Sequence, residues 1–271
     1  MKELAVVISN DNENVSAYET IDAIASSGFK NVFVQWYEND YKSFDVSQEE
    51  QVKYARNKGL NVIFAHLGYR NMNDIWLDGE SGEEFVRRYI KNLDDLKALG
   101  IDMVIMHACV GLDAPKPNRI GLERFRRICD HARELNIKVA FENTKMPGYL
   151  EYLVDHIDYD NVGVCYDCGH DHCHFKDNFD FEHFRDKMFA IHIHDNHGEK
   201  DEHLLPGDGS VNFDYVLDGL SIANYHSYLT FELCYRNGYL NEGIEDFYKK
   251  GYNLGMRLKK KYEEEYQWKN H

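Results

Sequence analysis

Residues 138–170 decide the fold, and they read KVAFENTKMPGYLEYLVDHIDYDNVGVCYDCGH. This stretch holds two short apolar runs, Lys138 to Glu142 and Asn161 to Asp167, and each run ends in an acidic side chain. The segment between them, residues 143–160, is long enough to carry the chain back to the start of a neighbouring parallel strand. The stretch therefore predicts two parallel strands joined by a crossover, with a polar residue at the carboxyl end of each strand.

The same pattern recurs along the whole chain. Short runs rich in Val and Ile alternate with longer segments that have helical spacing. The predicted strands are Leu4 to Ser9, Asn31 to Trp36, Asn61 to His66, Asp102 to His107, Lys138 to Glu142, Asn161 to Asp167, Phe189 to His194 and Tyr228 to Leu233. The clearest predicted helices are Ser16 to Ser27, Gln48 to Asn57, Glu83 to Leu99, Leu122 to Leu135 and Glu242 to Lys261.

Eight such units in 271 residues average about 34 residues each, and no linker rich in Pro or Ser divides them. Gly28, Gly59 and Gly100 each come shortly before a strand, where a left-handed residue commonly ends a helix. These features predict an α/β fold, a single-domain (β/α)8 TIM barrel over residues 1–271. The alternative is an open doubly wound sheet, but no Gly-x-Gly-x-x-Gly motif follows an early strand to support a dinucleotide site.

Composition excludes several classes of protein. The formal net charge of −16 disfavours duplex DNA and anionic membrane surfaces, because phosphate contacts require Lys and Arg. No apolar run approaches the roughly 18 residues of a membrane span, and the amino terminus does not resemble a signal peptide. Six scattered cysteines do not form a disulfide scaffold. We therefore expect a cytoplasmic protein with a small-molecule substrate, no nucleic acid or membrane partner, and scope for a homo-oligomer.

Polar side chains end most of the predicted strands. In a parallel barrel, the carboxyl ends of the strands meet at one mouth, so these side chains are expected to converge. They are His66, His107, Glu142, Asp167 with His170, His192 with His194, and Glu232, and the loop after the seventh strand adds Asp201 and His203. Imidazoles and carboxylates are the ligands that divalent first-row metals prefer, and a bound cation would neutralise such a cluster. The pattern predicts a metal site at the barrel mouth.

Other signals in the sequence are weaker. Cys165-x-x-Cys168 lacks the second pair that a zinc knuckle needs. Four more histidines are expected on loops or at the rim: His172, His174, His183 and His197. Five aromatic side chains near the predicted mouth could line a sugar site, or could equally belong to the core or to an interface: Trp36, Tyr37, Tyr69, Trp76 and Tyr235. Arg236 and Lys145 are candidates to meet a phosphate or carboxylate, although a surface role explains them equally well.

Several short motifs together resemble a known family. They are Phe141-Glu-Asn-Thr144, Asp167-Cys-Gly-His170, His192-Ile-His-Asp195, Asp201-Glu-His203 with Pro206-Gly-Asp-Gly209, and Phe231-Glu232. The combination is similar to the xylose isomerase-like barrel superfamily, which joins sugar isomerases and epimerases to AP endonucleases of the endonuclease IV type. The resemblance covers the whole chain and is strongest in its second half.

Each branch implies a different site. The isomerase and epimerase branch implies one divalent metal, often manganese, on Glu142, Asp167, His192 and Glu232. There Glu142 and Glu232 would also be the catalytic acid/base pair, and His170 would contact a substrate oxygen. The endonuclease branch implies three zinc ions held by nine residues. The matching positions are His66, His107, Glu142, Asp167, His170, His192, Asp201, His203 and Glu232.

The segment after His66 separates the two branches. Residues 67–80 contain one Arg and three acidic residues, whereas a loop that penetrates DNA should be basic. The leading hypothesis is therefore a metal-dependent isomerase or epimerase of a small sugar, polyol or keto compound, with one to three Zn²⁺ or Mn²⁺ ions. The alternatives are a zinc phosphodiesterase that acts on abasic DNA, and an accessory subunit whose barrel has kept metal but lost turnover.

Overall fold

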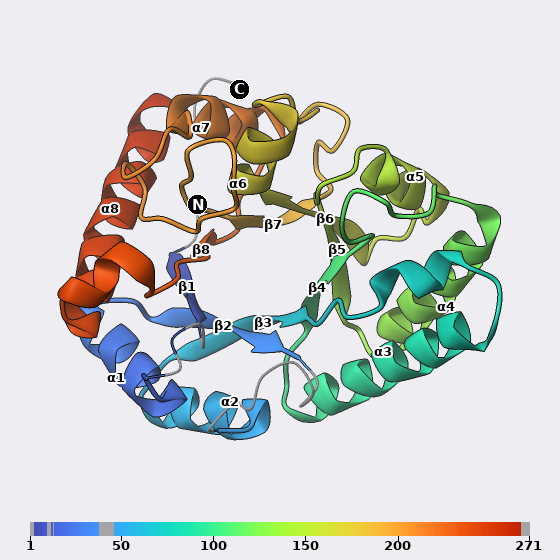
Figure 1. Ribbon diagram of the computed structural model, residues 1–271, viewed down its shortest axis with the longest axis horizontal. Coiled ribbons are helices and arrows are strands. Elements are labelled where there is room, and N and C mark those ends of the chain that lie inside the picture. Colours follow the sequence, from blue (N-terminus) through green and yellow to red (C-terminus); the bar gives the residue numbers. More distant parts are fainter. Residues whose placement is uncertain (1–2, 10–11, 13, 38–45, 267–271) are drawn as a thin grey trace.

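Eight parallel strands form a ring at the centre of the molecule, and the helices surround it (Figure 1). The computed structural model describes residues 3–9, 12, 14–37 and 46–266. The strands are β1 (Leu4–Ile8), β2 (Asn31–Trp36), β3 (Asn61–Leu67), β4 (Met103–His107), β5 (Lys138–Glu142), β6 (Val162–Asp167), β7 (Met188–His192) and β8 (Leu229–Phe231). All eight lie where the sequence predicted strands.

The sheet runs in the order β7-β6-β5-β4-β3-β2-β1-β8, so each strand pairs with its neighbour in sequence and β8 pairs with β1. The ring is nearly closed at the β7/β8 seam, where Ile193 and Phe231 form an isolated parallel bridge. The Ile193 amide donates to the Thr230 carbonyl at 2.8 Å, and the Glu232 amide donates to the Ile193 carbonyl at 3.0 Å. This closure confirms the predicted single-domain barrel and contradicts the open-sheet alternative.

The helices form the outer layer. They are α1 (Ala17–Ser27), α2 (Gln48–Asn57), α3 (Glu80–Ala98), α4 (Arg119–Glu134), α5 (Tyr149–His156), α6 (Cys168–His170), α7 (Phe213–Ile222) and α8 (Ile244–Glu265), with short turns η1 (Met72–Trp76), η2 (Asp171–Phe175) and η3 (Asn237–Asn241). Helix α1 begins with a capping box, in which the Ser16 side chain accepts from the Glu19 amide and the Glu19 carboxylate accepts from the Ser16 amide. It ends at Gly28, whose φ of 118° is readily adopted only by glycine.

Two predicted strands are too long. The sequence extended the seventh strand to His194 and the eighth to Leu233, but β7 ends at His192 and β8 at Phe231. Past β7, Ile193 still bridges to Phe231, and the chain then leaves the ring at Asp195, which pairs in antiparallel fashion with Leu204 of the following loop. His194 therefore lies beyond the end of β7, and Glu232 directly follows β8.

The barrel interior is filled by one apolar layer. Its buried residues are Val7, Phe33, Phe64, Ile105, Ala140, Cys165 and Ala190. Cys165 belongs to this layer, and Cys168 Sγ donates to the His194 carbonyl at 3.4 Å. The six cysteines are buried and form no disulfide, and neither Cys165 nor Cys168 belongs to a candidate metal group among the described residues. The observed placement gives no support to a zinc knuckle.

One aromatic residue expected at the mouth lies elsewhere. Trp76 is only 1% exposed, and its ring packs against Phe125 and Tyr149 in the layer outside the strands. Its indole N–H donates to the Ala108 carbonyl at 2.8 Å, which satisfies its polar atom inside the core. Of the two roles that the sequence left open for Trp76, the structure supports the one in the core. Within the described part of the chain, no helix has both the length and the hydropathy needed to cross a bilayer.

Candidate metal centre

The strands place polar side chains directly above the apolar interior layer. Along a strand, alternate residues share a face, so His66, His107 and Glu142 point the same way as the interior residues two positions before them. Asp167 and His192 occupy the last positions of β6 and β7 and follow the same rule. All five side chains are buried. The parity of the sequence thus predicted correctly that these strand ends converge.

Glu142 lies at the centre of this layer. Its Oε2 is 2.9 Å from His66 Nε2 and 3.0 Å from His107 Nε2, and its Oε1 is 3.0 Å from His192 Nδ1. Burial would raise the pKa of Glu142, but the positive charges of His192 and His107 outweigh it and hold that pKa well below the usual value. Glu142 is therefore an anion that three imidazoles share.

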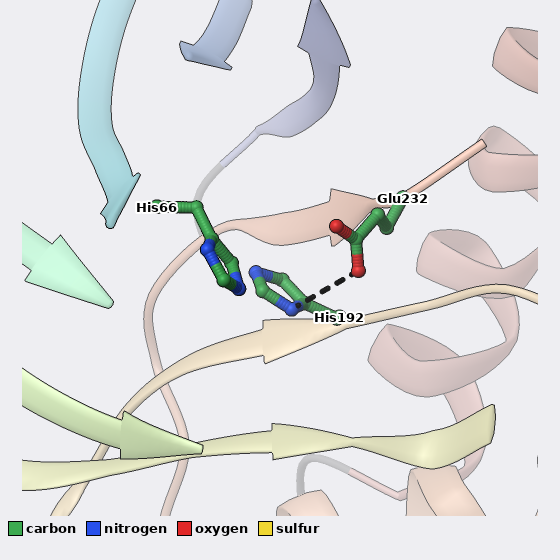
Figure 2. Close-up of side chains that lie close together, drawn as sticks. All are labelled: His66, His192 and Glu232. Carbon is green, nitrogen blue, oxygen red and sulfur yellow. Dashed lines mark ion pairs between the residues drawn. The ribbon is translucent and has the colours of Figure 1, made fainter. Parts of the chain in front are cut away.

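Four donor side chains from neighbouring strands, Glu142 among them, face one another. His192 Nδ1 lies 3.7 Å from Asp167 Oδ2 and 3.4 Å from Glu232 Oε2, and Figure 2 shows the second of these pairs beside His66. The ligand atoms of Glu142, Asp167, His192 and Glu232 all lie within 4.8 Å of one another. Burial would raise the pKa of Glu232, but His192 and His203 lower it overall. This arrangement makes the set a candidate site for one divalent cation.

Two further groups adjoin the four-donor set. His66, His107 and Glu142 form the first of these groups. A triad of His66, His192 and Glu232 shares two of its three members with the four-donor set, so it is not counted as a separate group. The other separate group combines His194 with Asp201 and His203 from the loop after β7. In that loop group, His194 Nε2 is 3.5 Å and His203 Nδ1 is 3.4 Å from Asp201 Oδ1. The mouth therefore holds three neighbouring groups of candidate metal ligands.

His170 approaches the loop group from α6. Its Nε2 is 3.3 Å from Asp201 Oδ2, while its Nδ1 contacts the Asn143 carbonyl at 2.8 Å, which fixes the ring orientation. Asp167 caps the helix, because its Oδ1 accepts from the His170 amide at 2.7 Å. The Asp167 carboxylate thus belongs to the four-donor set and also caps the helix that carries His170. All nine sequence-predicted residues therefore lie around one mouth, and their roles as ligands remain a prediction.

Aromatic rings support several imidazoles. The His192 ring stacks on Phe33 of the interior layer with centroids 5.2 Å apart. The His107 ring stacks on Tyr69 at 4.2 Å, and the His194 ring stacks on His203 at the same separation. Such stacking holds the rings in the orientation their nitrogens need. Tyr69 therefore lies at the mouth, as the sequence predicted.

The donor set fits a divalent metal. Buried polar atoms normally have hydrogen-bond partners, yet Asp201 Oδ1 and His203 Nδ1, which lie 3.4 Å apart in the loop group, have none among the described residues. Neutral imidazole nitrogens and ionised carboxylates in one buried cluster are the donors that Zn²⁺ and Mn²⁺ accept. Glu142, Asp167, His192 and Glu232 would hold one ion, and the two adjoining groups could hold others.

Sequence reasoning missed the role of one side chain. His194 was noted at a strand end but was not counted among the ligands, although the structure places its Nε2 3.1 Å from Asp167 Oδ1. The signal that could have found it is its spacing, two residues after His192 in the segment His-Ile-His. Away from the cluster, Lys145 is exposed and the Tyr235 hydroxyl donates to the Glu242 carbonyl at 2.5 Å.

Comparisons with known proteins agree with the architecture. A sequence model described as xylose isomerase-like TIM barrel matches residues 21–261. The uncharacterized protein y4fM of Sinorhizobium fredii is 31% identical over 193 residues, which is 66% of this chain and 60% of that protein. The chain thus matches less than two thirds of that relative's length.

Two solved structures are similar over almost the full chain. The IOLI protein with a bound zinc atom has a TM-score of 0.75 at 18% identity, covering 97% of this chain and 99% of that one. The D-allulose 3-epimerase of Methylomonas sp. in complex with D-allulose has a TM-score of 0.74 at 18% identity, covering 94% and 96%. At these identities the similarity establishes the shared fold.

Proposed function

Since the chain belongs to the xylose isomerase-like TIM barrel family, we propose that it is a metal-dependent isomerase or epimerase acting on a sugar, polyol or related keto compound. The observation that supports this most is the buried set Glu142, Asp167, His192 and Glu232, whose ligand atoms lie within 4.8 Å of one another. The epimerase fold of the Methylomonas neighbour, which was solved with D-allulose, agrees with a sugar-like substrate.

The two glutamates differ in their availability. Both oxygens of Glu142 contact imidazoles, and its side chain is 1% exposed, whereas the Glu232 side chain is 9% exposed. We assign to Glu232 the removal of a proton from the carbon beside the carbonyl, and to Glu142 the return of a proton. Because Glu142 is ionised at rest, it must first take up a proton from solvent, while Glu232 releases to solvent the proton it removed. The lowered pKa of Glu232 keeps it ionised and able to accept a proton at neutral pH. His170 would hold a substrate oxygen. A bound divalent ion would supply Lewis-acid stabilisation of the negative charge that develops on the substrate oxygens.

Proton exchange tests this proposal. Protein loaded with Mn²⁺ or Co²⁺ is incubated in D₂O with a panel of ketoses and inosose-type compounds, and deuterium at the α-carbon is followed by NMR. We expect exchange with at least one compound and its loss in Glu232→Gln, while Glu49→Gln on the exposed face of α2 leaves it unchanged. Absence of exchange across the whole panel would rule the proposal out.

The three donor groups support a second candidate, a zinc phosphodiesterase. Two or three adjacent metals can activate a water and stabilise a leaving oxygen, and Glu142 is shared between two of the groups. Close to three zinc ions per chain together with cleavage of an abasic duplex would favour this candidate. One ion per chain without cleavage would favour the isomerase. Activity that survives both Glu142→Gln and Glu232→Gln would contradict both candidates.

A further inference from the structure

A cavity of about 500 Å³ lies beside the candidate metal centre. It is formed by the loop after β7, the loop after β8, and Lys250 of α8. Glu202 and Leu204, which line it, flank His203, and the Cys234 amide donates to the His203 carbonyl at 3.4 Å. The backbone that carries a candidate ligand is therefore also a wall of this cavity. A volume of this size accommodates a small organic ligand.

Hydrogen-bonding groups of both kinds line the cavity. Arg236 Nη2 donates to the Glu202 carbonyl at 3.3 Å, but its buried Nε has no hydrogen-bond partner among the described residues. Arg236 is nevertheless a lining residue, so the remaining donors of its guanidinium group are available to a ligand in the cavity. On the far side, Asp208 accepts from the Tyr239 hydroxyl at 2.8 Å, and Lys250 Nζ lies 3.5 Å from the same carboxylate oxygen.

The charges of the lining exclude an anion as the preferred ligand. Three carboxylates, Glu202, Asp208 and Glu242, stand against two cations, Arg236 and Lys250. Lys250 is already paired with Asp208, and Glu202 is bound by the ring and amide of His197 at 2.8 and 2.9 Å. A phosphate would meet Arg236 together with an unneutralised Glu242 in a chain of net charge −16. Neutral hydroxyls can donate to the carboxylates and accept from Arg236 without this repulsion.

We infer that this cavity binds a second hydroxyl-rich ring, joined to the sugar that reacts at the metal centre, so that the substrate is an uncharged glycoside or disaccharide. The inference rests on the proposed function for the reacting end of the molecule. Arg236 and Glu242 are the specificity residues, one as donor and the other as acceptor. Tyr239, which also lines the cavity, adds an aromatic side chain of the kind that packs against sugar rings.

Binding measurements separate this inference from turnover. Saturation-transfer NMR and titration calorimetry on the metal-loaded chain compare D-fructose, D-fructose 6-phosphate and the keto disaccharides lactulose, turanose and palatinose. We expect at least one disaccharide to bind more tightly than D-fructose and than the phosphate. Arg236→Gln and Glu242→Gln should each weaken that disaccharide about tenfold and leave D-fructose unchanged, as expected for one lost charged hydrogen bond.

Two further variants make the test decisive. Arg236→Lys keeps the positive charge but loses the planar set of guanidinium donors, so it should weaken the disaccharide and would spare a phosphate. Arg257→Gln, on the exposed face of α8, is the control and should change nothing. The inference is overturned if no disaccharide exceeds D-fructose, or if the phosphate binds most tightly and depends on Arg236. Disaccharide binding without any proton exchange would instead leave the cavity assignment standing and remove the proposed reaction.

Discussion

At the scale of single residues, Glu142 has the largest number of contacts with imidazoles in the candidate centre. Three rings contact its two oxygens within 3.0 Å. Glu142→Gln keeps the shape but removes the charge, and we expect metal affinity to fall by more than about tenfold, since even the loss of indirect support costs roughly 10- to 100-fold. Metal content after equilibrium dialysis, measured by mass spectrometry, checks this. Glu49→Gln is the matched control, and equal metal content in both variants would contradict the role of Glu142.

His203 predicts how stability changes with pH in chelator-treated protein. Burial would lower its pKa, but Asp201 and Glu232 raise it to about 9. The stabilisation is complete below the unfolded pKa near 6.5 and is lost as pH rises through about 9, amounting to roughly 3 kcal/mol. Urea unfolding between pH 6 and 10 should therefore show a falling free energy. His203→Gln should flatten this dependence, and an unchanged slope would show that another group is responsible.

At the scale of elements, α6 and α4 each carry a glycine against which a ring packs. A Cβ at Gly169 would lie 1.9 Å from His194 Cε1, and a Cβ at Gly121 would lie 2.0 Å from the Trp76 ring. Both Gly→Ala variants should destabilise the protein by about 1 to 3 kcal/mol. Only Gly169→Ala displaces a candidate ligand, so it alone should bind less metal. Thermal unfolding and metal analysis of both variants check this, and identical metal content would remove His194 from the loop group.

The elements also show which part of the prediction depended on tertiary contacts. The alternation of apolar residues predicted all eight strands. Every second side chain of a strand points into the barrel interior and must be apolar there, whichever loops connect the strands. The end of β7 was overestimated because Asp195 pairs with Leu204, and the end of β8 because the Cys234 amide donates to the His203 carbonyl of the same loop. Each contact joins a strand end to a distant loop residue, and no local pattern reports it.

At the scale of the whole molecule, the β7/β8 seam is the weakest closure of the barrel. An isolated bridge joins the two strands, while His192 and Glu232 face one another across it at 3.4 Å. A metal held by both side chains would tie the seam. We expect the Ile193 and Glu232 amides to exchange with D₂O faster after chelation, while amides between β4 and β5 stay unchanged. Hydrogen-exchange mass spectrometry with and without EDTA measures this. Equal protection in the two conditions would show that metal binding does not stabilise the closure of the barrel.

The sequence by itself determined the barrel and the residue types at its mouth. Three local properties carry this information: the alternation of residues along the strands, the repeat of strand and helix, and the polar residues at most strand ends. In a parallel barrel the carboxyl ends of the strands meet at one mouth, so these polar residues converge. Only the tertiary structure decided that His194 joins Asp201 and His203, that Trp76 is buried in the core, and that Arg236 faces a cavity with Glu242. Loops set these contacts, and a loop's path depends on packing against residues far away in the sequence.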